Sequence, residues 1–411
     1  MADKVIEETL APFGDPVSPD EVSAPRRSRA RLAGVTPTEL ISLFGSPALF
    51  VLIFVVFALW LGGDFYNSSL RMLEFSQAVP AMVITLGVVV CLSVGQFDLS
   101  IAYNASLCGF VVIGLFYRND VPIWAAILLT LLLGSVVGLV NGLLVTKMHI
   151  NAFIATLGTG GVLLGLGRVY SDGGQAITPS PTDHPLPPWF RDYLGSFQYV
   201  ASTPVAVGIL LVLVAALLHT INGRALPSSM SRPVRVAILA AVAAVVLGGV
   251  AVSGILERVS LNVVIFLALA TGLWILMTYT TFGRNIYAVG SNPRAAGYAG
   301  ISVAKHTTMA FVLAGLMAAV AGIMLSAAQG SAIQGAADGF LLPAYAGAFL
   351  ATVLISRGRF HIWGAVAGSV GLIYVASGLV AGGVAYTWAD VINGAVLIGA
   401  VALSSVVRRS R

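Results

Sequence analysis

Long uncharged stretches alternate with short polar connections along the whole chain. Twelve of these stretches are about as long as a helix that crosses a bilayer core of about 30 Å, which takes roughly 20 residues. They lie at 46–63, 76–94, 101–117, 122–146, 150–170, 204–219, 234–255, 261–280, 308–327, 338–356, 362–383 and 389–407. They lack the residue-by-residue alternation of barrel strands. The pattern predicts an all-α, polytopic bundle of about 10–12 transmembrane helices.

The composition supports the same conclusion. The chain of 411 residues is 58% hydrophobic and 9% charged, whereas a soluble domain is about one quarter charged. The bilayer therefore has to solvate most of residues 41–411, which we predict to be one transmembrane domain. Residues 1–40 mix charges with Pro and Gly and carry no secretory signal. We expect them to form a disordered cytoplasmic tail.

The basic residues predict the orientation. If the N-terminus lies inside and all twelve stretches cross, only five of the 22 Lys and Arg residues face outward, namely Arg71, Arg118, Arg168, Arg191 and Arg258. The positive-inside rule therefore places both termini in the cytoplasm. The same rule accounts for the net charge of +5, so we expect no nucleic-acid partner.

Two regions interrupt the regular pattern. Residues 171–203 are rich in proline, which predicts an irregular or re-entrant segment, and residues 95–104 predict either a tight cytoplasmic turn or a break within the membrane. The glycine pairs at 161/165 and 364/368 have the spacing of close helix contacts. Cys91 and Cys108 lie in apolar stretches, where we expect small buried side chains.

The chain lacks the parts of an enzyme or of an ATPase. None of its three lysines follows a glycine as the phosphate-binding Gly-x-x-x-x-Gly-Lys loop requires. The five histidines are scattered, and no cluster of Cys and His has the spacing of metal ligands. We therefore expect no catalytic activity, metal or cofactor in this chain.

The predicted cytoplasmic loop 281–305 contains a short helix with a signal at each end. Asn292 suits the N-cap, Pro293 suits the first helical position, and Gly300 suits the position just past the end. These signals predict a helix of about two turns over roughly 293–299. It is either a docking element for another protein or an ordinary loop with a helical turn.

This loop also resembles a known family. The run from Gly283 to Pro293, followed by Ala295-Ala296 and Ala299-Gly300-Ile301, resembles the coupling loop of permeases in sugar-type ABC importers, the class for ribose, xylose, arabinose and galactose. The elements Asp98-Leu99-Ser100 and Asn151 to Gly158 are similar to two further motifs of that family, in the same order. The three predicted spans within 204–280 are similar to the longer, xylose-type members.

The resemblance implies a set of partners. A separate cytoplasmic ATPase would bind ATP and dock on the loop, an extracytoplasmic binding protein would deliver the sugar, and a second permease subunit would complete a homodimer in the inner membrane. A cysteine at Ala296 is then expected to reach the ATPase. The residues expected to shape or anchor the coupling element are Gly283, Arg284, Asn292, Pro293, Arg294 and Gly300.

The expected function is therefore import of a monosaccharide or related polyol, with an ion-driven secondary transporter as the alternative. The alternative needs carboxylates within the membrane, and Asp98, Asp338 and Asp390 at span edges are nearly the only candidates. Asp98 acts either in transport or as a cap that accepts backbone N–H bonds. The expected translocation pathway comprises Gln96, Asp98, Asn104, Asn151, Phe153 and Asn262.

Overall fold

A computed structural model describes residues 55–62, 68–195, 199–200, 214, 218, 232–240, 243, 259–354 and 360–409. The predicted tail at 1–40 lies outside the described residues. So do most of the predicted spans 46–63, 204–219 and 234–255. Residues Ser42–Arg411 form one compact unit.

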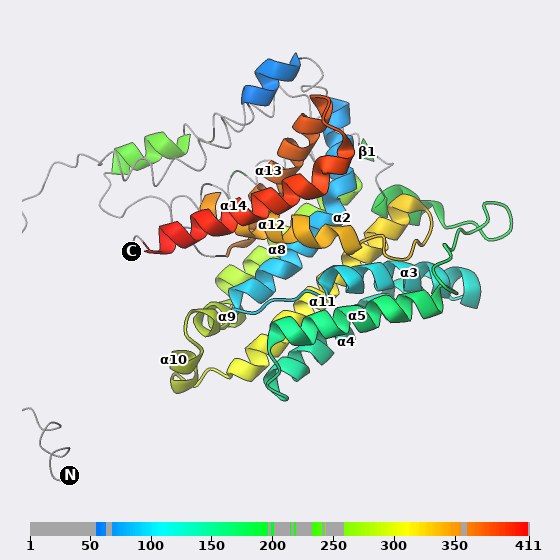
Figure 1. The fold of residues 1–411 in the computed structure, drawn as a ribbon, viewed down its shortest axis with the longest axis horizontal. Coiled ribbons are helices and arrows are strands. Elements are labelled where there is room, and N and C mark those ends of the chain that lie inside the picture. Colours follow the sequence, from blue (N-terminus) through cyan, green and yellow to red (C-terminus); the bar gives the residue numbers. More distant parts are fainter. Residues whose placement is uncertain are drawn as a thin grey trace, which may run out of the picture. The chain divides into compact units, whose positions relative to one another are not determined.

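Helices make up nearly all of the described unit (Figure 1). Their bounds are α2 (Ser68–Ser93), α3 (Ile101–Asn119), α4 (Ile123–Thr146), α5 (Ala152–Tyr170), α8 (Leu261–Tyr279), α9 (Thr281–Ser291), α10 (Pro293–Tyr298), α11 (Val303–Gln329), α12 (Leu341–Leu354), α13 (Ile362–Ala381) and α14 (Ala389–Arg409). The described residues also include one antiparallel pair of two-residue strands, β1 (Tyr199–Val200) and β2 (Val259–Ser260).

Seven of the described helices are long and apolar enough to cross a membrane: α2, α3, α4, α5, α8, α11 and α13. Each coincides with one of the stretches predicted from the sequence, so the helical membrane bundle is confirmed. The described part of the stretch at 338–356 forms a single 3₁₀ turn at Asp338–Phe340 followed by α12. Residues 355–356 at the end of this stretch lie outside the described residues.

Helix α11 is the centre of the bundle. It packs against α2, α3 and α4 (Figure 1). Glycines let the backbones of α4 and α11 touch: a side chain at Gly138 would collide with the carbonyl of Phe311, and one at Gly315 would collide with the carbonyl of Gly134. Such close approach is how apolar helices associate where lipid removes the hydrophobic driving force.

The two glycine pairs named from the sequence have different outcomes. Gly368 on α13 lies against the carbonyl of Gly347 on α12, as expected for a close helix contact. Gly161 and Gly165 on α5 face open space, so that pair makes no helix contact within the described chain. Spacing alone does not say which face of a helix is buried. The two cysteines are buried as predicted.

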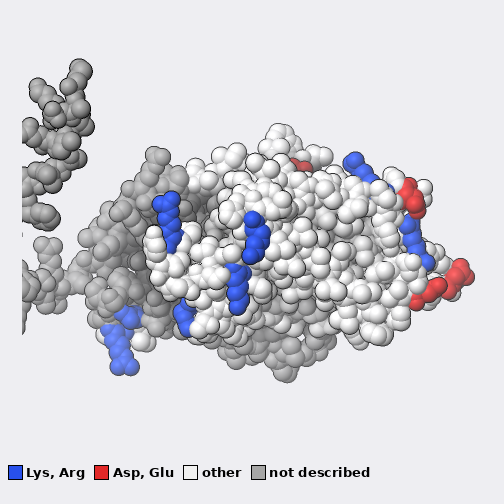
Figure 2. Space-filling model, turned by 90° about the horizontal axis from the view of Figure 1, so that it is seen from below, with Lys and Arg blue, Asp and Glu red and all other residues white. Residues whose placement is uncertain are grey.

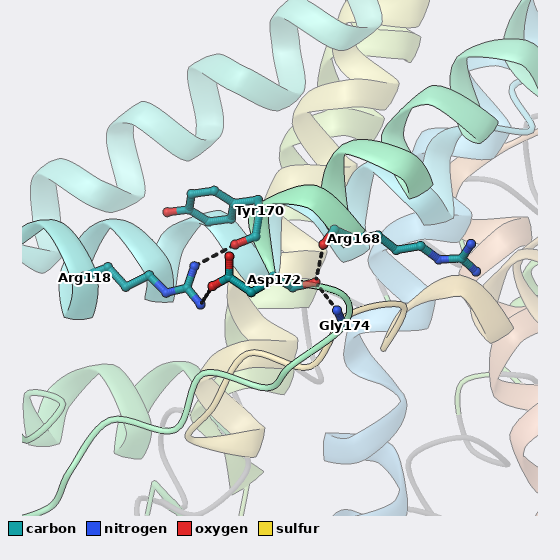
Figure 3. A network of polar contacts seen from close by, with 6 residues as sticks. Arg118, Arg168, Tyr170, Asp172 and Gly174 are labelled. Atoms are coloured by element: carbon teal, nitrogen blue, oxygen red, sulfur yellow. Dashed lines mark hydrogen bonds and ion pairs between the residues drawn. The ribbon is translucent and has the colours of Figure 1, made fainter.

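Residues 171–195 and 330–340 together cover one end of the bundle, which we term the cap end. Ile177 and Ala332 pair through their backbones, and Leu186 and Phe190 are buried. Figure 3 shows how the end of α5 is fixed: the guanidinium of Arg118 donates to the carbonyl of Tyr170 at 2.7 Å and to the carboxylate of Asp172 at 3.1 Å. The proline-rich segment is therefore irregular, as predicted.

Candidate functional site: a short exposed helix at one end of a membrane bundle

The short helix α10 forms as the sequence predicts, within one residue of its expected end. The side chain of Asn292 accepts the N–H of Ala295 at 3.0 Å, and Pro293 occupies the first turn. Gly300 adopts a φ of +79°, which favours glycine. The N–H of Ile301 donates to the carbonyl of Ala296 at 3.0 Å and closes the turn.

Helix α10 presents most of its surface outward. Pro293, Arg294 and Gly297 are exposed, and Tyr298 is 93% exposed. Ala296 is the exception at 4%, so the expectation that a cysteine at this position could reach a partner is wrong. Ala296 instead anchors α10 to the bundle. The sequence analysis missed Tyr298, although it lies one helical turn from Arg294 on the outward face.

The preceding helix α9 was not predicted, because the sequence analysis treated residues 281–292 as loop. It is amphipathic, with Ile286 and Val289 buried and Arg284 exposed. The hydroxyl of Thr280 caps it by accepting the N–H of Gly283 at 3.2 Å. Gly283 has a packing role, because a side chain there would collide with the backbone of Met277.

Helix α9 also touches the end of α2. A side chain at Gly290 would collide with the backbone carbonyl of Ser93, the last residue of α2. The segment that follows, residues 94–100, joins α2 to α3. Helix α9 is therefore in direct contact with the connection that contains Asp98.

Asp98 is buried at 2% exposure, and its Oδ1 accepts the N–H of Ser100 at 3.0 Å and the hydroxyl of Ser100 at 2.6 Å. The Nδ2 of Asn141 donates to that hydroxyl at 2.7 Å. The hydroxyl of Tyr345 accepts the N–H of Asp98 and donates to its carbonyl, each at 3.0 Å. Asp98 therefore accepts a backbone N–H in the turn that precedes α3, and the bonds of Asn141 and Tyr345 tie this connection to α4 and α12.

The remaining pathway candidates lie on or beside different helices. Asn104 and Asn262 are buried and donate to the carbonyls of Gly134 and Ser76 at 3.2 and 2.9 Å, which joins α3 to α4 and α8 to α2. Asn151 caps α5 by accepting the N–H of Phe153 at 2.9 Å. Phe153 is 53% exposed, and Gln96 is half-buried.

A cluster of polar residues that was not predicted from the sequence lies toward the cap end. The hydroxyl of Ser106 on α3 donates to the carboxylate of Asp338 at 2.6 Å and accepts the N–H of Ala337 at 3.0 Å. Ser106 and Asp338 line a small pocket with Tyr103 and Gln334. Burial raises the pKa of Asp338, while the hydrogen bond from Ser106 and the charge of Arg168 act in the opposite direction.

The two ends of the bundle differ in charge. Around α10 the exposed charged residues are basic, namely Lys147, Arg284, Arg294 and Lys305, and no Asp or Glu occurs between residues 281 and 305. At the cap end, Arg118 pairs with Asp172, and Asp120 lies beside His184. Figure 2 shows this contrast, with blue side chains alone toward one end and both colours at the other.

The apolar bundle of helices long enough to cross a bilayer defines an integral membrane protein. The comparisons agree with this class. A family model described as the permease component of branched-chain amino acid transport systems matches residues 74–401. The chain therefore belongs to this family of permeases and is a multi-pass membrane protein.

Several curated relatives are similar to most of the chain. The galactose/methyl galactoside import permease protein MglC of Escherichia coli K12 is 26% identical, over 87% of this chain and 93% of the relative. The xylose transport system permease protein XylH of the same strain is 27% identical, over 87% and 91%. The D-allose transport system permease protein AlsC is 27% identical, over 82% and 83%. No solved structure matches the chain.

Proposed function

We propose that this chain is the permease subunit of an ATP-binding-cassette importer for a monosaccharide or a related polyol. A separate cytoplasmic ATPase binds the ATP, and this chain converts its movement into a change of access across the membrane. The main support for the proposal is the exposed surface of α10, where Tyr298 is 93% exposed, in a chain that belongs to a permease family. Three relatives that are named as sugar permeases support the substrate class.

The proposal places the α10 end in the cytoplasm. The exposed Lys and Arg residues around α10 support this orientation, since such residues concentrate in cytoplasmic loops. Both termini then lie inside, and the cap end faces outward, where an extracytoplasmic sugar-binding protein would deliver the substrate. A second copy of the chain completes a two-fold symmetric permease, the commonest closed arrangement of identical subunits.

The docking contact can be tested with one cysteine at a time. Tyr298→Cys presents a thiol on the exposed face of α10, and Ala296→Cys places the same group on the buried face of the same helix as a matched control. Both native cysteines are fully buried and can remain. We expect a crosslink to the candidate ATPase from position 298 that changes with ATP, and none from 296. Free reactivity at 298 with no ATPase captured would refute the docking assignment.

The substrate and the energy source can be tested in vesicles that contain the permease, its ATPase and the binding protein. Uptake of galactose, xylose and allose is compared with uptake of leucine, because the family description names amino acids while the relatives are named for sugars. We expect ATP-dependent uptake of one of the sugars that persists after ionophores collapse ion gradients. Uptake that follows the gradient and ignores ATP would favour the ion-driven alternative.

The pathway assignment extends the proposal to six residues: Gln96, Asp98, Asn104, Asn151, Phe153 and Asn262. The partial exposure of Gln96 and Phe153 supports a position along the pathway for these two. Asp98→Asn keeps an oxygen that can accept both bonds from Ser100 but removes the charge. Unchanged transport with normal assembly would limit Asp98 to capping, whereas loss of transport with normal assembly would give its charge a role in transport.

A further inference from the structure

A histidine at the start of α11 joins the two helices that flank the docking helix. The Nε2 of His306 lies 3.2 Å from the Nδ2 of Asn285 on α9, and its Nδ1 lies 2.8 Å from the carbonyl of Ser302. The imidazole is buried at 9% exposure, and the ring of Phe282, also on α9, lies 5.9 Å from it. Helix α10 therefore lies between two helices that are bonded to each other.

The chemistry of these groups fixes the direction of both bonds. A backbone carbonyl can only accept, so the Nδ1 of His306 carries the proton and donates to Ser302. The Nδ2 of Asn285 can only donate, so the Nε2 of His306 accepts from it. Since a buried polar group left unpaired is unfavourable, each partner holds the other in place.

Without this bond the docking helix would have two pivots. Asn292 has extended backbone angles between α9 and α10, and Gly300 has a φ of +79° between α10 and α11. Rotation of the backbone at either position would let α10 move without moving the helix on the other side of that pivot. The contact between Asn285 and His306 bridges the two pivots, so that α9, α10 and the start of α11 form a closed loop.

We propose that Asn285 and His306 form a brace that transmits movement of α10 to α11, and through α11 to the helices packed on it. The inference rests on the proposed function, because it takes α10 as the element that the ATPase moves. Both residues are positioning residues: neither touches substrate or ATP. Their loss should leave the ATPase docked and hydrolysing ATP while less sugar is moved for each ATP.

The test measures the ratio of sugar imported to ATP hydrolysed by the full complex in vesicles. Asn285→Leu and His306→Leu each remove the brace, and we expect the ratio to fall roughly three- to tenfold, the effect of one buried hydrogen bond. The double variant should be no worse than either single variant. His306→Gln offers an amide to Asn285 and should restore at least half of the ratio.

Thr308→Val is the matched control. Thr308 lies two residues further along α11, and its hydroxyl meets that of Thr146 on α4 at 3.1 Å. This variant also removes a polar contact of α11, but one outside the loop around α10, so the ratio should stay unchanged.

The outcomes separate the brace from the proposed function. If the natural chain imports no sugar with ATP, the proposed function fails first. If the natural chain couples normally and Asn285→Leu does so as well, the brace alone is refuted. If Asn285→Leu and Thr308→Val lower the ratio equally, or if the ATPase no longer binds Asn285→Leu, the contact is merely structural and the brace is again refuted.

Discussion

Two short segments flank α11, and they are held in different ways. Helix α10 precedes α11 and is shaped by neighbours in sequence. The side chain of Asn292 accepts the N–H of Ala295, and the N–H of Ile301 donates to the carbonyl of Ala296. Residues 330–340 follow α11 and are held by distant partners: Ala332 pairs with Ile177, and Asp338 bonds Ser106. A segment shaped by itself can offer a surface to another protein, whereas one held from a distance is part of the bundle.

The largest effect is expected from separating helices α9 and α10 from the rest of the bundle. Gly290→Ala places a methyl group against the carbonyl of Ser93, where neither backbone can yield easily. We expect the free energy of unfolding to fall by about 3 kcal/mol and ATP-dependent transport to be lost. Thermal unfolding in detergent measures the first, and vesicle uptake the second.

Gly272→Ala is the control for this prediction, since Gly272 lies in helix α8 with open space around it. It should change the free energy of unfolding by less than about 1 kcal/mol in either direction, given the helix propensities of Gly and Ala. Equal effects of the two substitutions would contradict the proposed contact between α9 and α2.

At the cap end, Ser106→Ala leaves the N–H of Ala337 and the carboxylate of Asp338 without their shared partner. We expect a loss of about 2 kcal/mol, typical of buried groups left unpaired. Hydrogen exchange should quicken across residues 330–340 and stay unchanged in α10. Faster exchange in α10 would show that the two segments are not independent.

The cap of the docking helix should matter less for stability. Asn292→Ala removes the side chain that accepts the N–H of Ala295, which costs about 1 kcal/mol. The fraying should remain local, so exchange should quicken in α10 alone and ATPase affinity should fall. Asn292→Ser, which keeps a capping oxygen, serves as the control and should retain most of the affinity.

The smallest effect on stability is expected at the exposed side chain of Tyr298. Tyr298→Ala should change the free energy of unfolding by less than about 0.5 kcal/mol, because this residue is 93% exposed. It should nonetheless weaken ATPase binding at least tenfold, as aromatic anchors often dominate an interface. Titration of the ATPase onto the permease in nanodiscs measures this, and unchanged affinity would remove Tyr298 from the docking contact.

The sequence predicted what depends on composition and on near neighbours. Seven spans and the ends of α10 follow from apolar length and from the caps at Asn292 and Gly300. Helix α9 was not predicted because its Gly and Asn residues are typical of loops. Its buried face can be recognised only when the surface that Ile286 and Val289 pack against is known.

Contacts between distant residues could not be predicted in the same way. Tyr345 forms hydrogen bonds with Asp98, 247 positions away in the sequence, and Ser106 forms one with Asp338, 232 positions away. Nothing near either residue indicates its partner. The same limit explains Gly161 and Gly165, whose spacing is right but whose face of α5 meets no other described helix.

The single buried position of α10 has a consequence for how such a permease can diverge. Since Ala296 is the one buried residue of this helix, substitutions at Arg294, Gly297 and Tyr298 alter its exposed surface without disturbing the packing beneath. Selection for a new ATPase and selection for a stable bundle therefore act on different residues. A lineage could exchange one motor subunit for another through a few surface substitutions, while the membrane part kept its sequence and its cargo.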